Sequence, residues 1–353
     1  MNLQKRRFPI DPATGCLSEE DTKAYFSQIG FSIFGLGIGA SIAANLLYFV
    51  VAAFPIVTEN KLISVIASYI ITLIAIYCIG LPVFKVLSKP LPSVTPIKTK
   101  MRIGDLLGAV CVSLAAMMMG NYLSNMILLW LDTLFGITAE NPLESIIDPS
   151  DPYMVAVTVV FTVILAPILE ELLFRRILCK KLLPLGEGYA ILISAAAFGL
   201  IHGNFYQVAY GFLLGALFAF IYVKTGKLIY TIILHAIINF LGSVVGPYLM
   251  AFVDYEYINS LLESVSLGEA VDMTDPALMP LFIVSAYEMA IIAVGVTGVI
   301  LFFKARKRNA LSLESGILPP PRKGRVANLL CNVGVAAAIT YFTITMVLSL
   351  LPV

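Results

Sequence analysis

Charged side chains are scarce in this chain. Only 13% of its 353 residues are Asp, Glu, Lys or Arg, whereas a soluble globular domain carries about 25%. Hydrophobic residues make up 59% of the chain, and the mean hydropathy is +0.93. This composition argues against a large soluble domain and predicts a polytopic membrane protein. The formal net charge of +1 says little about partners, and we expect no nucleic-acid partner.

Cysteine and histidine are also few. The five cysteines are scattered and none belongs to a CxxC pair, which argues against a disulfide framework or a cysteine-ligated metal site. The helical zinc motif HExxH is absent. No serine or cysteine lies in a recognisable nucleophile motif. The chain has only two histidines, His202 and His235, and both lie in apolar segments.

Nine apolar segments are candidates for membrane spans, each of which needs about 20 residues. They are residues 31–54, 62–84, 103–130, 153–182, 189–202, 205–223, 228–250, 279–303 and 326–351. The sequence therefore predicts an all-α polytopic membrane protein of about nine transmembrane helices, in which spans four to seven form a bundled core. The fifth segment is short and the turn at Gly203-Asn204 is tight, so a re-entrant pair is the alternative for spans five and six.

The basic residues predict the orientation of these spans. With the N-terminus in the cytoplasm, Lys61 is the only one of the 23 Lys and Arg residues that falls outside, as the positive-inside rule requires. The C-terminus is then extracytoplasmic. The outside loops 132–152 and 254–275 are acidic and are expected to be solvated; the inside linkers 85–100 and 304–325 are suited to lie on anionic headgroups.

The predicted organisation has five parts. They are a cytoplasmic N-terminal segment (1–30), three transmembrane helices (31–130), a core of further helices (153–250), an acidic extracytoplasmic loop (251–278), and two last helices joined by a basic cytoplasmic linker (279–353).

The fourth span contains the sequence EELLFR, residues 170–175. A charged residue at the centre of a transmembrane helix costs about 2.5–3.5 kcal/mol on insertion scales, so these groups are expected to be paired or functional. Glu171 and Arg175 are four residues apart and are predicted to pair along the helix. Glu170 then points about 100° away and can face a cavity. Pro167 is the one expected interruption of this span.

Helical rise places the remaining polar groups near the same depth. At about 1.5 Å per residue, Glu170 lies about 15 Å above the inner boundary, His235 about 12 Å and Asn239 about 18 Å. His202 comes out at about 22 Å and agrees less well. Phe198 shares a helix face with His202, as Asn239 does with His235. These depths predict one shared intramembrane site.

Several chemistries fit such a site. Glu170 can act as general base on a water, one histidine can orient that water, and the other histidine with Asn239 can donate to an oxyanion. The alternative is a zinc site formed by Glu170, His202 and His235. The groups can also hold helices together by hydrogen bonds alone, or form a proton relay. Glu288, in the eighth span, favours a relay but is better explained as a bridge to a neighbouring helix.

Three segments resemble the motifs of the CAAX-processing and bacteriocin-processing (CPBP, or Abi) family of membrane proteases. They are EELLFR (170–175), FGLIH (198–202) and HAIIN (235–239), which match EExxxR, FxxxH and HxxxN in order. The resemblance covers residues 153–250 and implies an intramembrane glutamic endopeptidase without a cofactor. By this resemblance Glu170 activates water, His202 assists, and His235 and Asn239 form the oxyanion hole; Glu171 and Arg175 hold the site together.

The resemblance also implies partners and a location. The substrate is a hydrophobic peptide or protein, with prenylated CAAX proteins among those that the family processes, and the chain is expected in a bacterial plasma membrane. A catalytically silent scaffold or bacteriocin-immunity protein on the same fold is the first alternative. A proton-coupled transporter is the second. The sequence does not indicate an oligomeric state.

Overall fold

The described part of the chain is helical. The structure is a computed structural model that describes residues 8–137, 141, 148–268, 270 and 272–351. These residues form helices and no strand beyond two isolated bridges, which confirms the all-α polytopic prediction. The basic residues Lys5, Arg6 and Arg7 and the acidic residues Glu140, Glu144 and Glu269 lie outside the described residues.

Within those residues, seven helical runs are long and apolar enough to cross a membrane. They are α1 (Glu19–Val51), α3–η1–α4 (Lys61–Ser88), α5 (Ile103–Phe135), α6 to η4 (Pro152–Leu185), α10 (Phe205–Thr225), α11–η5–α12 (Leu228–Met250) and η6–α14 (Pro276–Lys307). Two shorter apolar helices are α9 (Glu187–Leu200) and α16 (Val333–Leu348). At 14 residues, α9 is about 21 Å long, short of a core of about 30 Å. The total of nine spans therefore stays a prediction.

Helix caps move several ends away from the predicted limits. The first helix begins at Glu19, because the side chain of Ser18 accepts a hydrogen bond from the Asp21 amide and caps a polar first turn. The ninth predicted span is divided into α15 (Arg325–Leu330) and α16. Asn332 lies between them and caps α16 by accepting from the Val335 amide. Hydropathy alone does not detect these capping residues.

Two of the connections that were predicted to lie outside the membrane contain helices of their own. The short α2 (Pro55–Glu59) lies between the first two long helices. The helix α13 (Tyr255–Ser266) lies in the acidic segment, where Asp254 caps it by accepting from the Tyr257 amide. The sequence did not predict this helix, although none of its residues is buried.

Of the four wide π-turns that interrupt the spans, three come just before a proline. They are η1 (Ile74–Gly80), η2 (Val159–Leu165) and η5 (Leu241–Val245), and the second residue after each is Pro82, Pro167 or Pro247. A proline ring clashes with the carbonyl four residues earlier, and a π-turn widens the helix at that point. The interruption predicted at Pro167 therefore takes the form of a wide turn.

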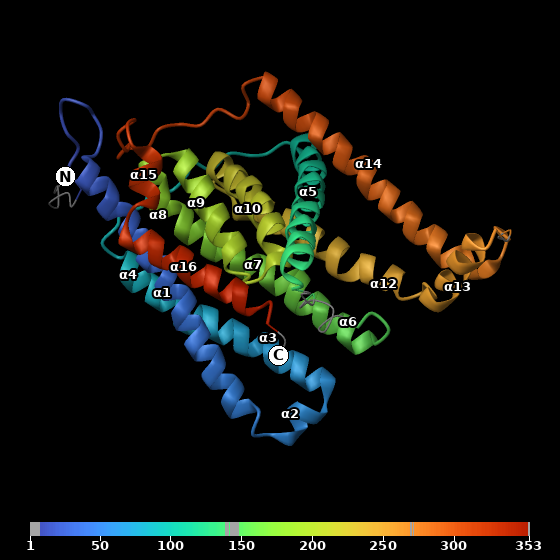
Figure 1. Cartoon of the computed structure of the whole chain (residues 1–353). Helices are drawn as coiled ribbons and strands as arrows, with labels where there is room; N and C mark the ends of the chain where they lie inside the picture. Colours follow the sequence, from blue (N-terminus) through green and yellow to red (C-terminus); the bar gives the residue numbers. More distant parts are fainter. Residues whose placement is uncertain (1–7, 138–140, 142–147, 269, 271, 352–353) are drawn as a thin grey trace.

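The elements that carry the motifs pack around α10. In Figure 1, α10 lies between α9 and α5, while α14 packs on the far side of α5 and α1 packs against α16 and α4 (Leu81–Ser88). Glycines allow α9 and α10 to approach closely. A Cβ on Gly211 would lie 3.1 Å from Cα of Gly199, and one on Gly215 would lie 3.1 Å from Cα of Ala195. Such small-residue contacts are typical of membrane helix pairs.

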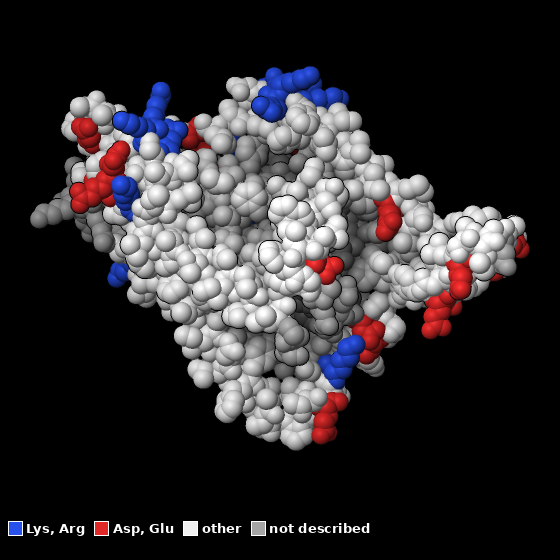
Figure 2. All heavy atoms as spheres, in the orientation of Figure 1, with Lys and Arg blue, Asp and Glu red and all other residues white. Residues whose placement is uncertain are grey.

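The two linkers 85–100 and 304–325 are bound to the helix ends. The Leu318 amide donates to the Pro184 carbonyl at 2.7 Å, and the Val94 amide donates to the Lys180 carbonyl at 2.9 Å. Figure 2 shows blue Lys and Arg side chains gathered along the upper edge of this face, near the end of α14, and mainly red acidic groups at the lower right. The sequence predicted this separation of charge but not the protein contacts of the linkers.

Candidate active site

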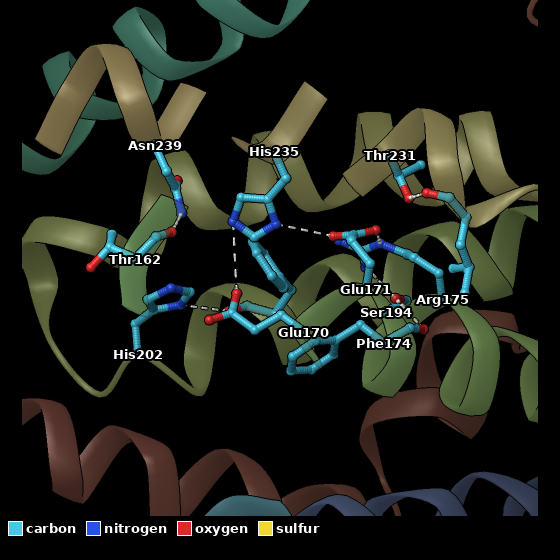
Figure 3. Close-up of polar contacts among 12 residues, drawn as sticks. Thr162, Glu170, Glu171, Phe174, Arg175, Ser194, His202, Thr231, His235 and Asn239 are labelled. Carbon is cyan, nitrogen blue, oxygen red and sulfur yellow. Dashed lines mark hydrogen bonds and ion pairs between the residues drawn. The ribbon is translucent and has the colours of Figure 1, made fainter. Parts of the chain in front are cut away.

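Three parts of the chain bring the predicted polar residues together (Figure 3). Glu170 and Glu171 end α7 (Ala166–Glu171), and Arg175 lies in the π-turn η3 (Leu172–Cys179) that follows. Phe198 belongs to the last turn of α9, and His202 lies in the turn after it. His235 and Asn239 lie on α11 (Leu228–Phe240). The motifs therefore converge on one region between these helices.

The predicted ion pair of EELLFR is confirmed. Arg175 Nε donates to Glu171 Oε2 at 3.0 Å, and both side chains are fully buried. The guanidinium also donates through Nη1 to Ser194 Oγ at 2.7 Å, and Ser194 donates to the Phe174 carbonyl at 3.2 Å. The arginine lies over the Phe198 ring, 4.9 Å from its centroid. The charges are thus balanced and fixed inside the protein.

His235 lies between the two glutamates. Its Nδ1 is 3.3 Å from Glu171 Oε1, and its Nε2 is 3.8 Å from Glu170 Oε2. The Glu170 oxygen is buried but makes no hydrogen bond, although a quarter of that side chain is exposed. Glu171 Oε1 also makes no hydrogen bond, but Arg175 holds the other oxygen of Glu171. Within the described residues, Glu170 is therefore the carboxylate of the two that lacks an arginine partner, as its position on the helix predicted. His235 thus faces one carboxylate oxygen with each of its ring nitrogens.

The backbone determines the tautomer of His202. Its Nδ1 lies 2.8 Å from the Phe198 carbonyl oxygen. A carbonyl can only accept, so the hydrogen is on Nδ1 when the ring is neutral. Nε2 then carries a lone pair and can accept a proton or a hydrogen bond from water. The Phe198 ring lies 5.3 Å from the His202 ring and 5.6 Å from the His235 ring, so it packs between the two histidines.

Asn239 is tied to the π-turn in the neighbouring span. Its Nδ2 donates to the Thr162 carbonyl oxygen at 2.8 Å. That carbonyl lacks the usual backbone donors, because the Ala166 amide bonds to Phe161 and Pro167 has no N–H. The asparagine therefore satisfies a backbone group that the proline leaves without a partner. One amide hydrogen of Asn239 remains for another acceptor.

Comparison with known proteins gives two findings for this region. Residues 152–241 match the family model described as Type II CAAX prenyl endopeptidase Rce1-like. The chain is 28% identical over 142 residues to human CAAX prenyl protease 2, a match that covers 33% of this chain and 42% of that protein. Both matches support the resemblance to the CPBP family that the three motifs indicate. The chain matches less than half of the length of this human protein. No solved structure matches the chain.

The CPBP motifs do not include every residue that contacts the charged groups. Ser194, which accepts from Arg175, is the one partner with a sequence signal, because residues 194, 198 and 202 share a helix face. Thr162 contributes only its backbone. Tyr77 interacts electrostatically with both glutamates, and Tyr210 does so with Glu170. Neither tyrosine belongs to one of the three motifs, so the motif spacing did not predict them as neighbours of the glutamates.

The zinc ligands considered as an alternative, Glu170, His202 and His235, have other neighbours. Among the described residues, no three His, Cys, Asp or Glu side chains are grouped as a metal ion would require. The nitrogens of His235 are directed to the two glutamates, and Nδ1 of His202 is directed to a carbonyl.

Glu288 does not belong to this site. It lies exposed on α14 and forms no hydrogen bond or ion pair within the part of the chain that the structure describes. The predicted bridge to a neighbouring helix is therefore absent from these residues, and the neighbouring Tyr287 bonds to the Leu241 carbonyl instead. Periodicity could not show which face of α14 the rest of the chain covers.

Proposed function

We propose that the protein is an intramembrane glutamic endopeptidase. The observation that carries this proposal is the state of Glu170, whose buried Oε2 has no hydrogen bond and lies 3.8 Å from His235. A partly desolvated carboxylate with a free oxygen is suited to take a proton from water. The match to the Rce1-like CAAX prenyl endopeptidases supports peptide hydrolysis as the reaction.

The reaction requires two proton transfers at Glu170. The carboxylate takes a proton from water while the water oxygen bonds to the scissile carbonyl carbon, whose oxygen becomes an oxyanion. The carbon–nitrogen bond then breaks, and the proton passes from Glu170 to the leaving amine. His202 accepts a hydrogen bond from the water through Nε2. His235 and the second amide hydrogen of Asn239 donate to the oxyanion.

The ion pair of Glu171 and Arg175 acts through His235. Glu171 lies against Nδ1 of the imidazole, which leaves Nε2 to face Glu170 and the substrate. Arg175 in turn fixes Glu171 and is itself held by Ser194. We propose that these two residues position His235 and do not touch the substrate.

The proposed substrate is a prenylated peptide of the CAAX class, cut near the cytoplasmic leaflet. The names of the matching family and of the human relative both specify prenyl substrates. The N-terminus is proposed to be cytoplasmic, which places the basic helix ends and the linkers on the same side as such a substrate.

The test is peptide cleavage in proteoliposomes of purified protein. Glu170→Gln removes the base but keeps the shape of the side chain, so kcat is expected to fall by at least about 10²-fold. Glu288→Gln makes the same chemical change outside the site and leaves kcat unchanged. Equal turnover by wild type and Glu170→Gln contradicts the proposal and supports a non-catalytic scaffold. Full activity after treatment with a chelator, in protein shown to be metal-free, tests the proposed independence from zinc.

A further inference from the structure

A chain of side-chain hydrogen bonds leads from the His202 turn to Tyr210. Asn204 donates through Nδ2 to the His202 carbonyl at 2.9 Å and to Gln207 Oε1 at 2.8 Å. Gln207 donates through Nε2 to the Tyr210 hydroxyl oxygen at 2.7 Å. These three residues occupy the first turns of α10 and lie outside the three motifs.

The backbone fixes the direction of these bonds. Asn204 is the N-cap of α10, and its Oδ1 accepts from the Gln207 amide at 2.9 Å. A backbone N–H can only donate, so Nδ2 of Asn204 must point the other way, to Oε1 of Gln207. The NH₂ group of Gln207 then faces Tyr210. The Tyr210 oxygen accepts this bond, which leaves the phenolic hydrogen as a free donor.

Tyr210 lies beside the proposed catalytic groups. Side chains on a helix lean toward its N-terminus, so Tyr210 leans toward the turn that carries His202. The two rings are 6.4 Å apart between centroids, and Tyr210 interacts electrostatically with Glu170. The next residue, Gly211, lies against the same histidine, since a Cβ there would be 3.6 Å from its Nδ1. The hydroxyl thus shares a polar region with Glu170 and His202.

We propose that the Tyr210 hydroxyl donates a hydrogen bond to the oxyanion of the tetrahedral intermediate. This inference rests on the proposed peptidase function. Asn239 uses one of its two amide hydrogens on Thr162, and Tyr210 supplies a donor in addition to the one that remains. Because the Tyr210 oxygen accepts from Gln207, its O–H is polarised and donates more strongly. Asn204 and Gln207 are positioning residues in this scheme.

Two variants separate this role from a structural one. Tyr210→Phe removes the hydroxyl and is expected to lower kcat by about 10²-fold with little change in KM, as for loss of one oxyanion donor. Gln207→Glu still accepts from Asn204, but a carboxylate has no hydrogen to give Tyr210 and takes the phenolic hydrogen instead. All the bonds remain while the donor turns away, so kcat is again expected to fall. Unchanged kcat in either variant overturns the proposal.

A tyrosine outside the site provides the matched control. Tyr287 donates to the Leu241 carbonyl at 3.0 Å, and Tyr287→Phe removes a hydroxyl without changing kcat. Thermal unfolding of each variant in detergent shows that the fold is intact. Loss of activity in Glu170→Gln together with full activity in Tyr210→Phe overturns only the role of Tyr210. Full activity in Glu170→Gln overturns the peptidase proposal itself.

A binding measurement tests the same hydrogen bond without turnover. A peptidyl trifluoromethyl ketone hydrates to a tetrahedral diol, whereas the matching methyl ketone stays planar. Tyr210→Phe and Gln207→Glu are expected to raise the Kd of the trifluoromethyl ketone about tenfold and to leave that of the methyl ketone unchanged. Equal loss of affinity for both ketones, or equal affinity of the wild type for both, overturns the proposal.

Discussion

Asn239 donates its side-chain amide to the Thr162 carbonyl oxygen at 2.8 Å. The bond joins α11 to the π-turn before Pro167 and satisfies a carbonyl without a backbone donor. Asn239→Leu is therefore expected to lower the free energy of unfolding by about 1–3 kcal/mol, the cost of an unsatisfied buried polar group. Denaturant unfolding in detergent measures this loss.

Pro167→Ala provides the matching half of a double-mutant cycle. The alanine restores an N–H that can bond to the Thr162 carbonyl, so Asn239→Leu is expected to cost less in this background. A coupling free energy of about 1 kcal/mol between the two sites is expected. If the effects of the two substitutions on the free energy of unfolding are strictly additive, the Thr162 carbonyl does not depend on Asn239 for its hydrogen bond.

Arg175→Met is expected to destabilise the protein strongly. The arginine and Glu171 are fully buried, and removal of one partner from a buried pair costs about 3–5 kcal/mol. The double variant Glu171→Leu/Arg175→Met is expected to lose less than the sum of the two single variants. The exposed pair of Lys61 and Asp148 is the control, and Lys61→Met leaves the melting temperature unchanged. Similar unfolding curves for Arg175→Met and wild type would contradict this prediction.

Gly199→Ala is expected to separate α9 from α10. The new Cβ would lie 2.6 Å from the Val208 carbonyl oxygen, and such overpacking costs about 1–3 kcal/mol. Because His202 follows α9 directly, activity is expected to fall as well. Gly104→Ala adds the same methyl group to open space and keeps both stability and activity. Normal turnover in Gly199→Ala would show that the close helix contact is not needed for catalysis.

Glu187→Ala is expected to release the linker 304–325 from the helix ends. Glu187 Oε2 accepts from Lys224 Nζ at 2.5 Å and from the Glu314 amide at 2.8 Å. Loss of both bonds is expected to increase tryptic cleavage at Arg322 and Lys323 severalfold. Glu314→Ala is the control, since its backbone, not its side chain, makes the bond. Equal cleavage rates in the two variants would contradict this role of Glu187.

The sequence predicted the polar residues of the site better than their partners. Spacing alone paired Glu171 with Arg175 and left Glu170 free, because both statements depend only on helical geometry. It could not show that His235 lies between both glutamates, or that Tyr77 and Tyr210 come close enough to Glu170 to interact with it electrostatically. Those contacts depend on how separate spans are rotated and packed, and no local pattern in a uniformly apolar helix records this.

The limits of the spans were predicted to within a few residues where apolar runs end in glycine or lysine. The run 228–250 was predicted with the ends observed. The prediction was wrong where a cap decides the end, as at Ser18 and Asn332. It also missed the π-turns, although a proline follows three of them.

The π-turn η2 holds one residue more than an α-helix of the same rise would need. Elsewhere in a membrane helix, gain or loss of a residue rotates everything beyond it by about 100°. Here the helix on either side is held by its own packing, and the wide turn can take up the change. A shortened chain would close the turn and leave the two glutamates facing their histidine. The part of the helix that can best accept a change in length, η2, therefore lies close to the two glutamates, whose positions are the most constrained.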